Sequence, residues 1–575
     1  MRRILFLIFF FLFIASLLEA RNRDEPIKIT FEGNKIIKTS QLEELVGAKK
    51  PSIFAFWKED KSTINALLIP KLDEILRLFY RQEGFYEATI KHTIDEQGIH
   101  FVIQENRPII IEKINIEAKY PIDDLVTLKE GTRFRTTTFS KTKANIKRVL
   151  LNKGLCRHKL NAKAYIDLEN YTANIDIKLR KGEMCYFGEI TSSSEKPSTI
   201  GEDVILSRLH FRKGEPFNLE KIKESYESLY ALESFDNLHI LYNAKYSSKI
   251  PVNIKFQELE SKTHSRVGLG YATDLKFQAK YHWDHKNFYG GGRKLAFDLL
   301  YSNKQKWIEN SFFNPAIVTI GDYHLDFQNS VGYREERNIH NFDEKLVYNR
   351  VYLQHREDRW LHSVGVGFEN HEISNDRAFF LIYPFIKLVY DRRDSKINPK
   401  KGFYFAHDME YGLPYSPDST TYLKYTEELR GIYTLYDVTL SAVGRFGAIR
   451  VYQNRLPESK RFFAGGAFSN RAYGYERIGI TNSTTNPLGL GGLSMANLSL
   501  EANFPLYKNL YFGLFNDNSI ISENEKIWEL NDKVIKSVGF GFRYMTPVGP
   551  FKLDFGFNTA DYSKNGVHFQ VGQSF

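Results

Sequence analysis

The chain has 575 residues and a formal net charge of +10, from 79 Lys and Arg against 69 Asp and Glu. Only 42% of the residues are hydrophobic, which excludes a bundle of membrane-spanning helices, since each such helix needs about 20 consecutive apolar residues. Abundant aromatic residues and mixed charges exclude a disordered chain. Two cysteines are too few for a disulfide-rich scaffold, and the mild positive charge does not indicate nucleic acid.

Residues 1–20 have the pattern of an export signal peptide. Arg2 and Arg3 precede an apolar run from Ile4 to Leu18, which is short for a membrane span and typical of the apolar core of a signal peptide. Ala20 supplies the small residue expected before a cleavage site. An uncleaved N-terminal anchor is the alternative. In both cases the rest of the chain is expected to cross the inner membrane.

Three units with one shared pattern follow, at residues 26–106, 109–182 and 185–261. Each unit begins with a short strand, continues with apolar residues at helical spacing, such as Leu72 and Leu76, and ends with two alternating strands. Units of this size are typical of small α+β domains in series. Such an arm has exposed sheet edges, which can accept an added strand from another chain.

Both cysteines lie near the closing strands of the second unit. If residues 162–167 pair with residues 172–177 as an antiparallel hairpin, Cys156 lies opposite position 183, two residues from Cys185. A disulfide is expected there in an oxidising periplasm, and it would stabilise the fold by about 3 kcal/mol in the chain-entropy model. The alternative is two separate buried thiols, and a metal site is not expected from two cysteines alone.

From residue 264 to residue 575 the hydrophobic pattern changes to period two. In residues 275–283 and 551–557, apolar and aromatic side chains alternate with polar side chains or glycine. This alternation is typical of strands between lipid and an aqueous lumen, and a soluble β-sandwich is the alternative. Sixteen such segments can be counted, an even number as in bacterial barrels. The longest connection, residues 450–492, has little strand character, and loops of that length are usually functional or disordered.

Four motifs in this half of the chain resemble those of one protein family. They are Arg461–Gly466 with Asn470–Tyr473 in the long loop, Asp391–Asp394 with Asn398–Gly402, Thr546–Phe551 with Asp554, and the ending Phe569–Phe575. Together they resemble the outer-membrane assembly and secretion superfamily, which includes BamA, TamA and the two-partner secretion transporters. The resemblance covers nearly the whole mature chain. This sequence departs from the loop motif at Ala472, where glycine is usual, and at Asn470, where an apolar residue is usual.

The resemblance implies three α+β POTRA repeats in the periplasm, followed by an all-β outer-membrane barrel of sixteen antiparallel strands with the long loop folded inward. It also implies that Arg471, followed by Ala472 and Tyr473, pairs with the inward-facing acids Glu501 and Asp517 of the next two strands. Such pairing would hold the loop inside the barrel, because an unpaired charge in a confined site is costly. An exposed loop arginine is the alternative.

The seam between the first and last barrel strands is the second expected site. The first strand contains Gly268 and Gly270, and the last contains Val571, Gly572 and the final Phe575. Glycine weakens strand packing, and unpaired backbone groups are costly in lipid. An incoming β-strand could satisfy these groups by adding to the sheet edge. Ordinary barrel curvature is the alternative reading of the glycines.

The resemblance, with its three repeats, implies a TamA-like factor without enzymatic activity that inserts or secretes β-barrel or autotransporter clients at the seam. The expected partners are unfolded outer-membrane clients, an inner-membrane-anchored TamB-like protein and the lipid and lipopolysaccharide of the membrane. No cofactor, metal or nucleic acid is expected, and the sequence lacks the Gly-x-Ser-x-Gly and His-Glu-x-x-His motifs of common hydrolases. The alternatives are a BamA-type general insertase, a dedicated two-partner translocator and a passive pore.

Overall fold

The computed structural model describes residues 27–48, 62–64, 69–96, 98–243, 247–272, 276–320, 323–337, 339, 342–357, 359–374, 376–396, 398–480, 490–507, 509–526, 534–546 and 549–571. The expected signal peptide, residues 1–20, and the seam positions Gly572 and Phe575 lie outside these residues. Across the described segments, no helix has both the length and the apolar composition needed to span a membrane.

The first repeat has a four-stranded sheet covered by helices. Its elements are β1 (Ile27–Glu32), α2 (Thr39–Leu45), β2 (Thr63–Ile64), α3 (Ile69–Gln82), β3 (Thr89–Asp95) and β4 (Gly98–Gln104). The strand order is β2-β1-β4-β3, with β1 parallel to β4. Leu72, Leu76 and Tyr80 are buried on α3, because residues four apart share one helical face. The helical spacing of this segment was predicted correctly, whereas the parallel pairing of β1 with β4 was not predicted.

The second and third repeats have three-stranded sheets. The second contains β5 (Ile110–Ala118), η2 (Asp123–Leu125), α4 (Thr136–Asn152), β6 (Lys159–Asp167) and β7 (Thr172–Arg180), and the third contains β8 (Tyr186–Ser194), α5 (Glu202–Leu206), α6 (Leu219–Tyr230), β9 (Phe235–Tyr242) and β10 (Lys249–Glu258). Their strand orders are β5-β7-β6 and β8-β10-β9. In both sheets the last strand of the repeat is central, beside the first strand.

The first two repeats contact each other through a buried ion pair. Arg133 of the second repeat lies 2.7 Å from Glu83 of the first, and both side chains are largely buried. The same guanidinium lies over the ring of Phe85, 5.0 Å from its centroid. The side chain of Arg133 therefore joins the first and second repeats through both the ion pair and the ring contact.

The hairpin of the second repeat has the predicted register, with Asp167 opposite Thr172. Cys156 and Cys185 are both buried and both free in the structure, so the expected disulfide is not formed there. Burial raises the pKa of the Cys156 thiol, and a hydrogen bond with Cys185 raises it further. The backbone N–H groups of Cys156 and Cys185 both donate to the carbonyl of Gly154, at 3.1 and 2.8 Å, so the two cysteines are neighbours, and the disulfide remains a prediction.

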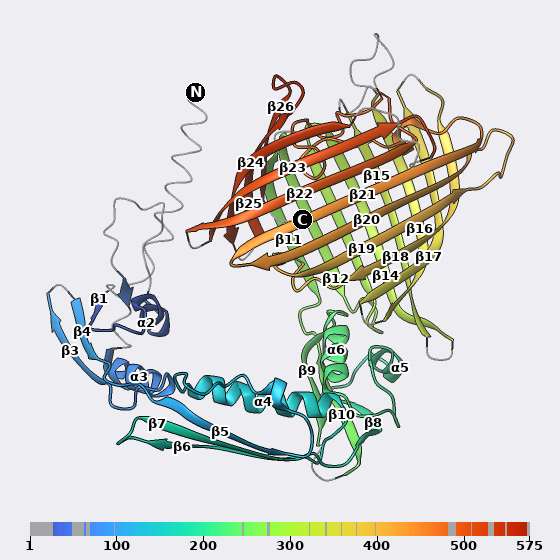
Figure 1. Cartoon of the computed structure of the whole chain (residues 1–575). Coiled ribbons are helices and arrows are strands. Elements are labelled where there is room, and N and C mark those ends of the chain that lie inside the picture. Colours follow the sequence, from blue (N-terminus) through green and yellow to red (C-terminus); the bar gives the residue numbers. More distant parts are fainter. Residues whose placement is uncertain are drawn as a thin grey trace. The chain divides into compact units, whose positions relative to one another are not determined.

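From Thr263 on, the described residues form a barrel of sixteen antiparallel strands, in which each strand pairs with the next along the chain (Figure 1). This agrees with the predicted strand count and excludes the β-sandwich alternative. The strands are β11 (Thr263–Ala272), β12 (Lys276–Lys286), β13 (Lys294–Ser302), β14 (Gln305–Ile320), β15 (Tyr323–Glu336), β16 (Glu344–Glu357), β17 (Trp360–Ile373), β18 (Phe379–Asp391), β19 (Gly402–Gly412), β20 (Thr421–Leu435), β21 (Val438–Gln453), β22 (Ser494–Tyr507), β23 (Leu510–Ser522), β24 (Ile535–Thr546), β25 (Gly549–Asn558) and β26 (Asn565–Val571).

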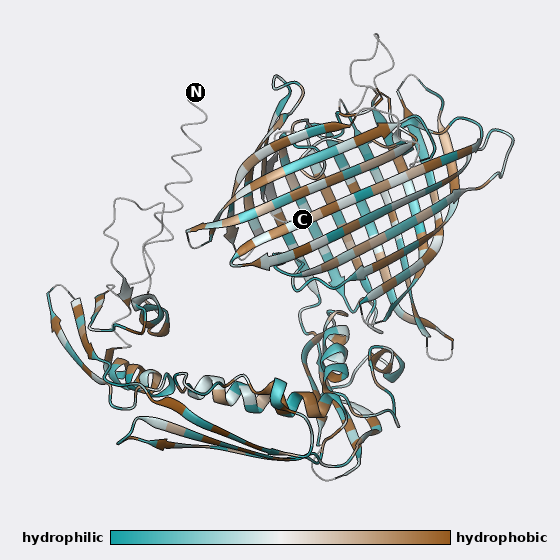
Figure 2. Cartoon of the chain, in the orientation of Figure 1, coloured by the Kyte–Doolittle hydropathy of each residue, from teal (hydrophilic) through white to brown (hydrophobic). Residues whose placement is uncertain are grey.

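The barrel strands alternate between hydrophobic and hydrophilic residues along their length (Figure 2). On β25, Phe551 is 37% exposed, whereas its neighbour Lys552 and the aspartate at position 554 are almost completely buried. Apolar side chains therefore face outward and charged side chains face inward, as in a barrel with lipid outside. The inward charges are the starting point for the functional site.

Candidate functional site

The long loop between β21 and β22 lies against the inner faces of the barrel strands. It begins at residue 454 rather than at the predicted residue 450, because β21 continues to Gln453. The sequence predicted little strand character in this loop. The loop nevertheless contains isolated antiparallel bridges, which join Phe462 to Gly492 and Ala464 to Ile478. These bridges satisfy backbone groups that would otherwise be buried without partners.

Apolar side chains of the loop pack against apolar side chains of the strands. Leu456, Phe462 and Ile478 of the loop belong to one buried cluster with Tyr422 of β20 and Ile449 of β21. Burial of this apolar surface favours the inward position of the loop. The cluster has no charge of its own, so the orientation of the loop depends on the polar contacts around it.

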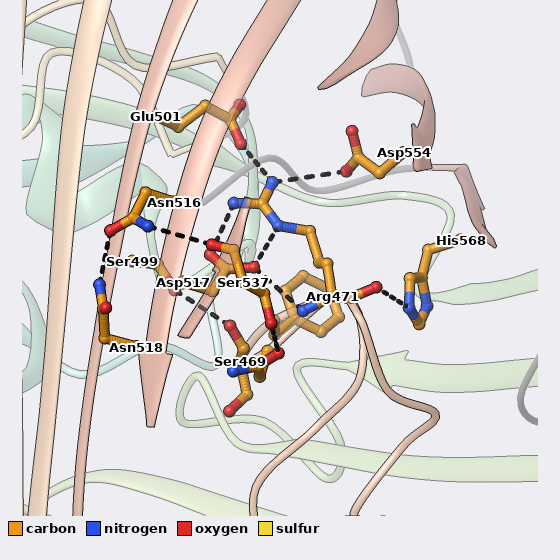
Figure 3. Close-up of polar contacts among 12 residues, drawn as sticks. Ser469, Arg471, Ser499, Glu501, Asn516, Asp517, Asn518, Ser537, Asp554 and His568 are labelled. Atoms are coloured by element: carbon orange, nitrogen blue, oxygen red, sulfur yellow. Dashed lines mark hydrogen bonds and ion pairs between the residues drawn. The ribbon is translucent and has the colours of Figure 1, made fainter. Parts of the chain in front are cut away.

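Arg471 forms the centre of these polar contacts (Figure 3). Its Nε and Nη2 each donate to Asp517 at 2.9 Å, and its backbone N–H donates to the same carboxylate at 3.0 Å. Its Nη1 lies 2.5 Å from Glu501, and the guanidinium stacks 3.5 Å from the centroid of the Phe515 ring. The structure thus brings Arg471 together with Glu501 of β22 and Asp517 of β23, the two acids that the resemblance implied.

Two further charged residues extend this cluster, and neither was predicted as a member of the site. Arg543 of β24 lies 3.1 Å from Glu501 and 2.6 Å from Asp554 of β25, and Asp554 lies 3.5 Å from Arg471. Asp554 was visible in a family motif, and Arg543 follows two glycines, Gly539 and Gly541, at alternate positions of β24. The period-two pattern shows that both side chains face inward, but it does not identify their partners. The alternating charges keep each buried carboxylate beside a cation.

The backbone at Arg471 rests directly on the last hairpin of the barrel. A Cβ atom at Gly556 of β25 would lie 2.3 Å from the carbonyl oxygen of Arg471, and one at Gly566 of β26 would lie 2.6 Å from it. These two glycines are cross-strand partners, and the ring of His568 on β26 lies 3.1 Å from the same carbonyl oxygen. Only a position without a side chain allows the loop to approach this closely.

The neighbours of Arg471 explain how this chain tolerates its departures from the family motif. Ala472 is buried and is not among the residues with positive φ, so its backbone does not require the glycine that is usual there. Asn470 is fully buried, and its side chain donates to the backbone of Ile535 at 3.2 Å and accepts from Ser537 at 2.6 Å. Tyr473 accepts a hydrogen bond from a β25 asparagine at 2.7 Å. Asn470 therefore replaces an apolar contact with hydrogen bonds.

The described parts of β11 and β26 are not joined by a hydrogen-bonded ladder, although each pairs with its other neighbour. Gly268 and Gly270 lie on β11 opposite residues of β12, and Val571 lies on β26 opposite Phe551 of β25. The predicted seam residues within the described segments therefore lie on the two strands that end the sheet.

Comparisons with known proteins agree with this architecture. A family model described as the Omp85 superfamily domain matches residues 287–575, and a POTRA model, described as a surface antigen variable number repeat, matches residues 27–106. The chain is 21% identical to the outer membrane protein assembly factor BamA of Nitratidesulfovibrio vulgaris, over 95% of this chain and 73% of that protein. It is 22% identical to BamA of Buchnera aphidicola, over 60% of this chain and 57% of that protein.

Among solved structures, BamA from Haemophilus ducreyi lacking POTRA domains 1–3 superposes with a TM-score of 0.55 at 15% identity, covering 81% of this chain and all of that chain. This likeness supports the fold. The Omp85 model covers more than half of the 575 residues. The chain therefore belongs to the Omp85 superfamily, as an outer-membrane β-barrel protein that carries POTRA structure on its periplasmic side.

Proposed function

We propose that this protein assembles or translocates other outer-membrane proteins by offering the edges of β11 and β26 to incoming client strands. The observation that carries the proposal is that β11 and β26 are the two end strands of the sixteen-stranded order, the first paired with β12 and the last with β25. Backbone groups without partners are costly in lipid, so an edge in the membrane has a strong tendency to pair. A client strand would supply those partners by strand addition.

The POTRA repeats support a role in receiving clients. Each of their sheets leaves strands at its edges, such as β6 in the second repeat and β8 in the third. An exposed edge binds an extended peptide through its backbone and therefore tolerates many client sequences. The finer proposal is a TamA-like factor that handles β-barrel or autotransporter clients together with an inner-membrane-anchored TamB-like partner. Three repeats, rather than five or two, support this choice.

A BamA-type general insertase is the second candidate. It is favoured by the two BamA relatives, one of which aligns with 95% of this chain. The two candidates share the mechanism at the seam and differ in the range of clients and in the partner. Neither candidate function involves a chemical reaction. The proposed function is therefore strand pairing and membrane insertion of client proteins.

Site-specific photocrosslinking in growing cells tests the mechanism, with the probe at Gly270 on β11 or at Val571 on β26. A matched control probe at Val364 on β17 faces outward, with 56% of its surface exposed, far along the sheet from the seam. Crosslinks from both seam positions to several unfolded barrel precursors, with none from Val364, are expected. A narrow set of autotransporter clients with an inner-membrane-anchored partner would favour the TamA-like role, and a broad set would favour a general insertase. Crosslinks to one soluble exported protein would instead indicate a two-partner translocator.

A further inference from the structure

A second cluster of buried charges contacts the long loop on a different group of strands from those that hold Arg471. Lys460 is the last residue of η3 (Glu458–Lys460) and is 7% exposed. Its Nζ lies 2.7 Å from Glu369 of β17 and 2.9 Å from Glu410 of β19. The ammonium group also lies 4.4 Å from the centroid of the Tyr383 ring on β18. Lysine is seldom buried without such partners, so these strands provide a specific site for its charge.

The two carboxylates are oriented by groups of the barrel itself. The hydroxyl of Tyr383 donates to Glu369 at 2.6 Å, and the hydroxyl of Tyr422 on β20 donates to Glu410 at 3.0 Å. A Cβ atom at Gly367 would lie 2.3 Å from the ring of Tyr383, which shows that the missing side chain makes room for that ring. The site for Lys460 is therefore arranged by residues outside the loop, as preorganised binding requires.

The loop makes two more contacts beside Lys460. Lys424 of β20 donates to the backbone carbonyl of Lys460 at 2.8 Å. The hydroxyl of Ser459 lies 3.1 Å from Nδ1 of His371, a buried ring whose two nitrogens lie 2.7 Å from Glu344 and 3.0 Å from Glu369. The segment around residue 460 is thus fixed through both its backbone and its side chains.

We propose that Lys460 is a second anchor of the loop, a positioning residue that holds its first half against β17 and β19 independently of Arg471. The two anchors use different strands, β16–β20 for Lys460 and β22–β26 for Arg471. Without the ion pairs of Lys460, the first half of the loop would be held by apolar packing and by the contacts of Ser459 and the Lys460 carbonyl, whereas Arg471 holds only the second half. This proposal concerns the position of the loop and does not depend on strand templating at the seam.

Cysteine labelling of the full-length protein in outer-membrane vesicles tests the proposal with one reporter for each half of the loop. Leu456→Cys places a thiol at a buried loop position near Lys460, and Ser499→Cys places one on β22, where the serine donates to the carbonyl of Ser469 at 3.1 Å. The parent protein without a reporter gives the background of the two native cysteines, which are buried. A bulky maleimide labels each reporter only when the loop moves away.

Lys460→Met is expected to raise the labelling rate of Leu456→Cys by at least about tenfold, which corresponds to about 1.4 kcal/mol, while that of Ser499→Cys stays within about twofold. Arg471→Ala should show the opposite pattern. Lys460→Arg keeps the charge and should restore protection, and Lys564→Met removes a lysine with 57% side-chain exposure as the matched control. General loosening of the barrel would not produce opposite patterns at the two reporters.

The partner charge provides an independent check. Once Lys460 is methionine, the largely buried Glu410, with 17% side-chain exposure, has lost one of its cations, so adding Glu410→Gln should recover part of the protection at Leu456→Cys. If Lys460→Met does not fold, Glu410→Gln alone retains the contact of Lys460 with Glu369 and should give a smaller rise of the same kind. Unchanged labelling of Leu456→Cys in every folded variant, or equal rises at both reporters, would overturn the proposal.

Discussion

Replacing Arg471 with alanine should destabilise the barrel more than any other single change in the loop. The side chain is 2% exposed and is surrounded by Asp517 at 2.9 Å, Glu501 at 2.5 Å and Asp554 at 3.5 Å. Removing one partner of a buried ion pair typically costs about 3–5 kcal/mol, because the remaining charge stays buried. In the variant, Arg543 still contacts Glu501 and Asp554. Asp517 is therefore the buried carboxylate that loses its cation.

The assay is the temperature at which the purified protein in detergent changes from its folded to its unfolded mobility on a gel. A loss of 3–5 kcal/mol should lower this midpoint by roughly 5–10 °C. Arg471→Lys should lie between wild type and alanine, because lysine keeps the charge but cannot form the two parallel bonds to Asp517. Arg461, which lies 3.4 Å from Glu458 and is partly exposed, is the matched control for loss of a loop arginine.

The double variant Arg471→Met/Asp517→Asn separates the ion pair from simple loss of packing. If the penalty comes from the unpaired carboxylate, the double variant should be more stable than the sum of the two single effects indicates. An unchanged midpoint in Arg471→Ala, or strictly additive effects in the double variant, would refute the reasoning from charge burial.

Three other predictions follow from separate parts of the chain. Gly556→Val should displace the loop backbone and lower the same unfolding midpoint, whereas Gly431→Ala, where an added Cβ meets nothing within 4 Å, should leave it unchanged. If Cys156 and Cys185 form the predicted disulfide in cells, the denatured but unreduced protein should contain no thiol that reacts with iodoacetamide; two reactive thiols would contradict it. Arg133→Ala should weaken the junction of the first two repeats by about 1–3 kcal/mol and speed limited proteolysis between them, and unchanged proteolysis would contradict that role.

Local periodicity predicted most of the elements and part of the site. The four-residue spacing of Leu72 and Leu76 identified α3, and the hairpin register with Asp167 opposite Thr172 followed from two alternating runs with a short turn. Arg471 and its two acids were identified because a loop motif resembles those of known relatives. These features depend on residues close in sequence or on a recognisable motif.

Features that depend on partners far apart in the chain were not predicted. The parallel pairing of β1 with β4 joins segments separated by two helices, and nothing in either strand specifies the other. Lys460 directly precedes a family motif, but its sequence neighbours give no sign that it is buried between Glu369 and Glu410. Alternation along a strand identifies the face of a side chain, whereas a contact across the lumen depends on the path of the loop.

The loop and the last strand form one connected structure, which links the two sites that were predicted separately. The carbonyl of Arg471 lies above Gly566 and beside His568, both on β26, the strand that also forms one edge of the seam. Coupling between two sites is reciprocal in free energy, so a change that loosens the loop must also change the stability of β26 in the sheet. Arg471→Ala should therefore alter the yield of client crosslinks from Val571 on β26 more than the yield from Gly270 on β11. Equal changes at both positions would show that the loop acts on the barrel as a whole and not through its last strand.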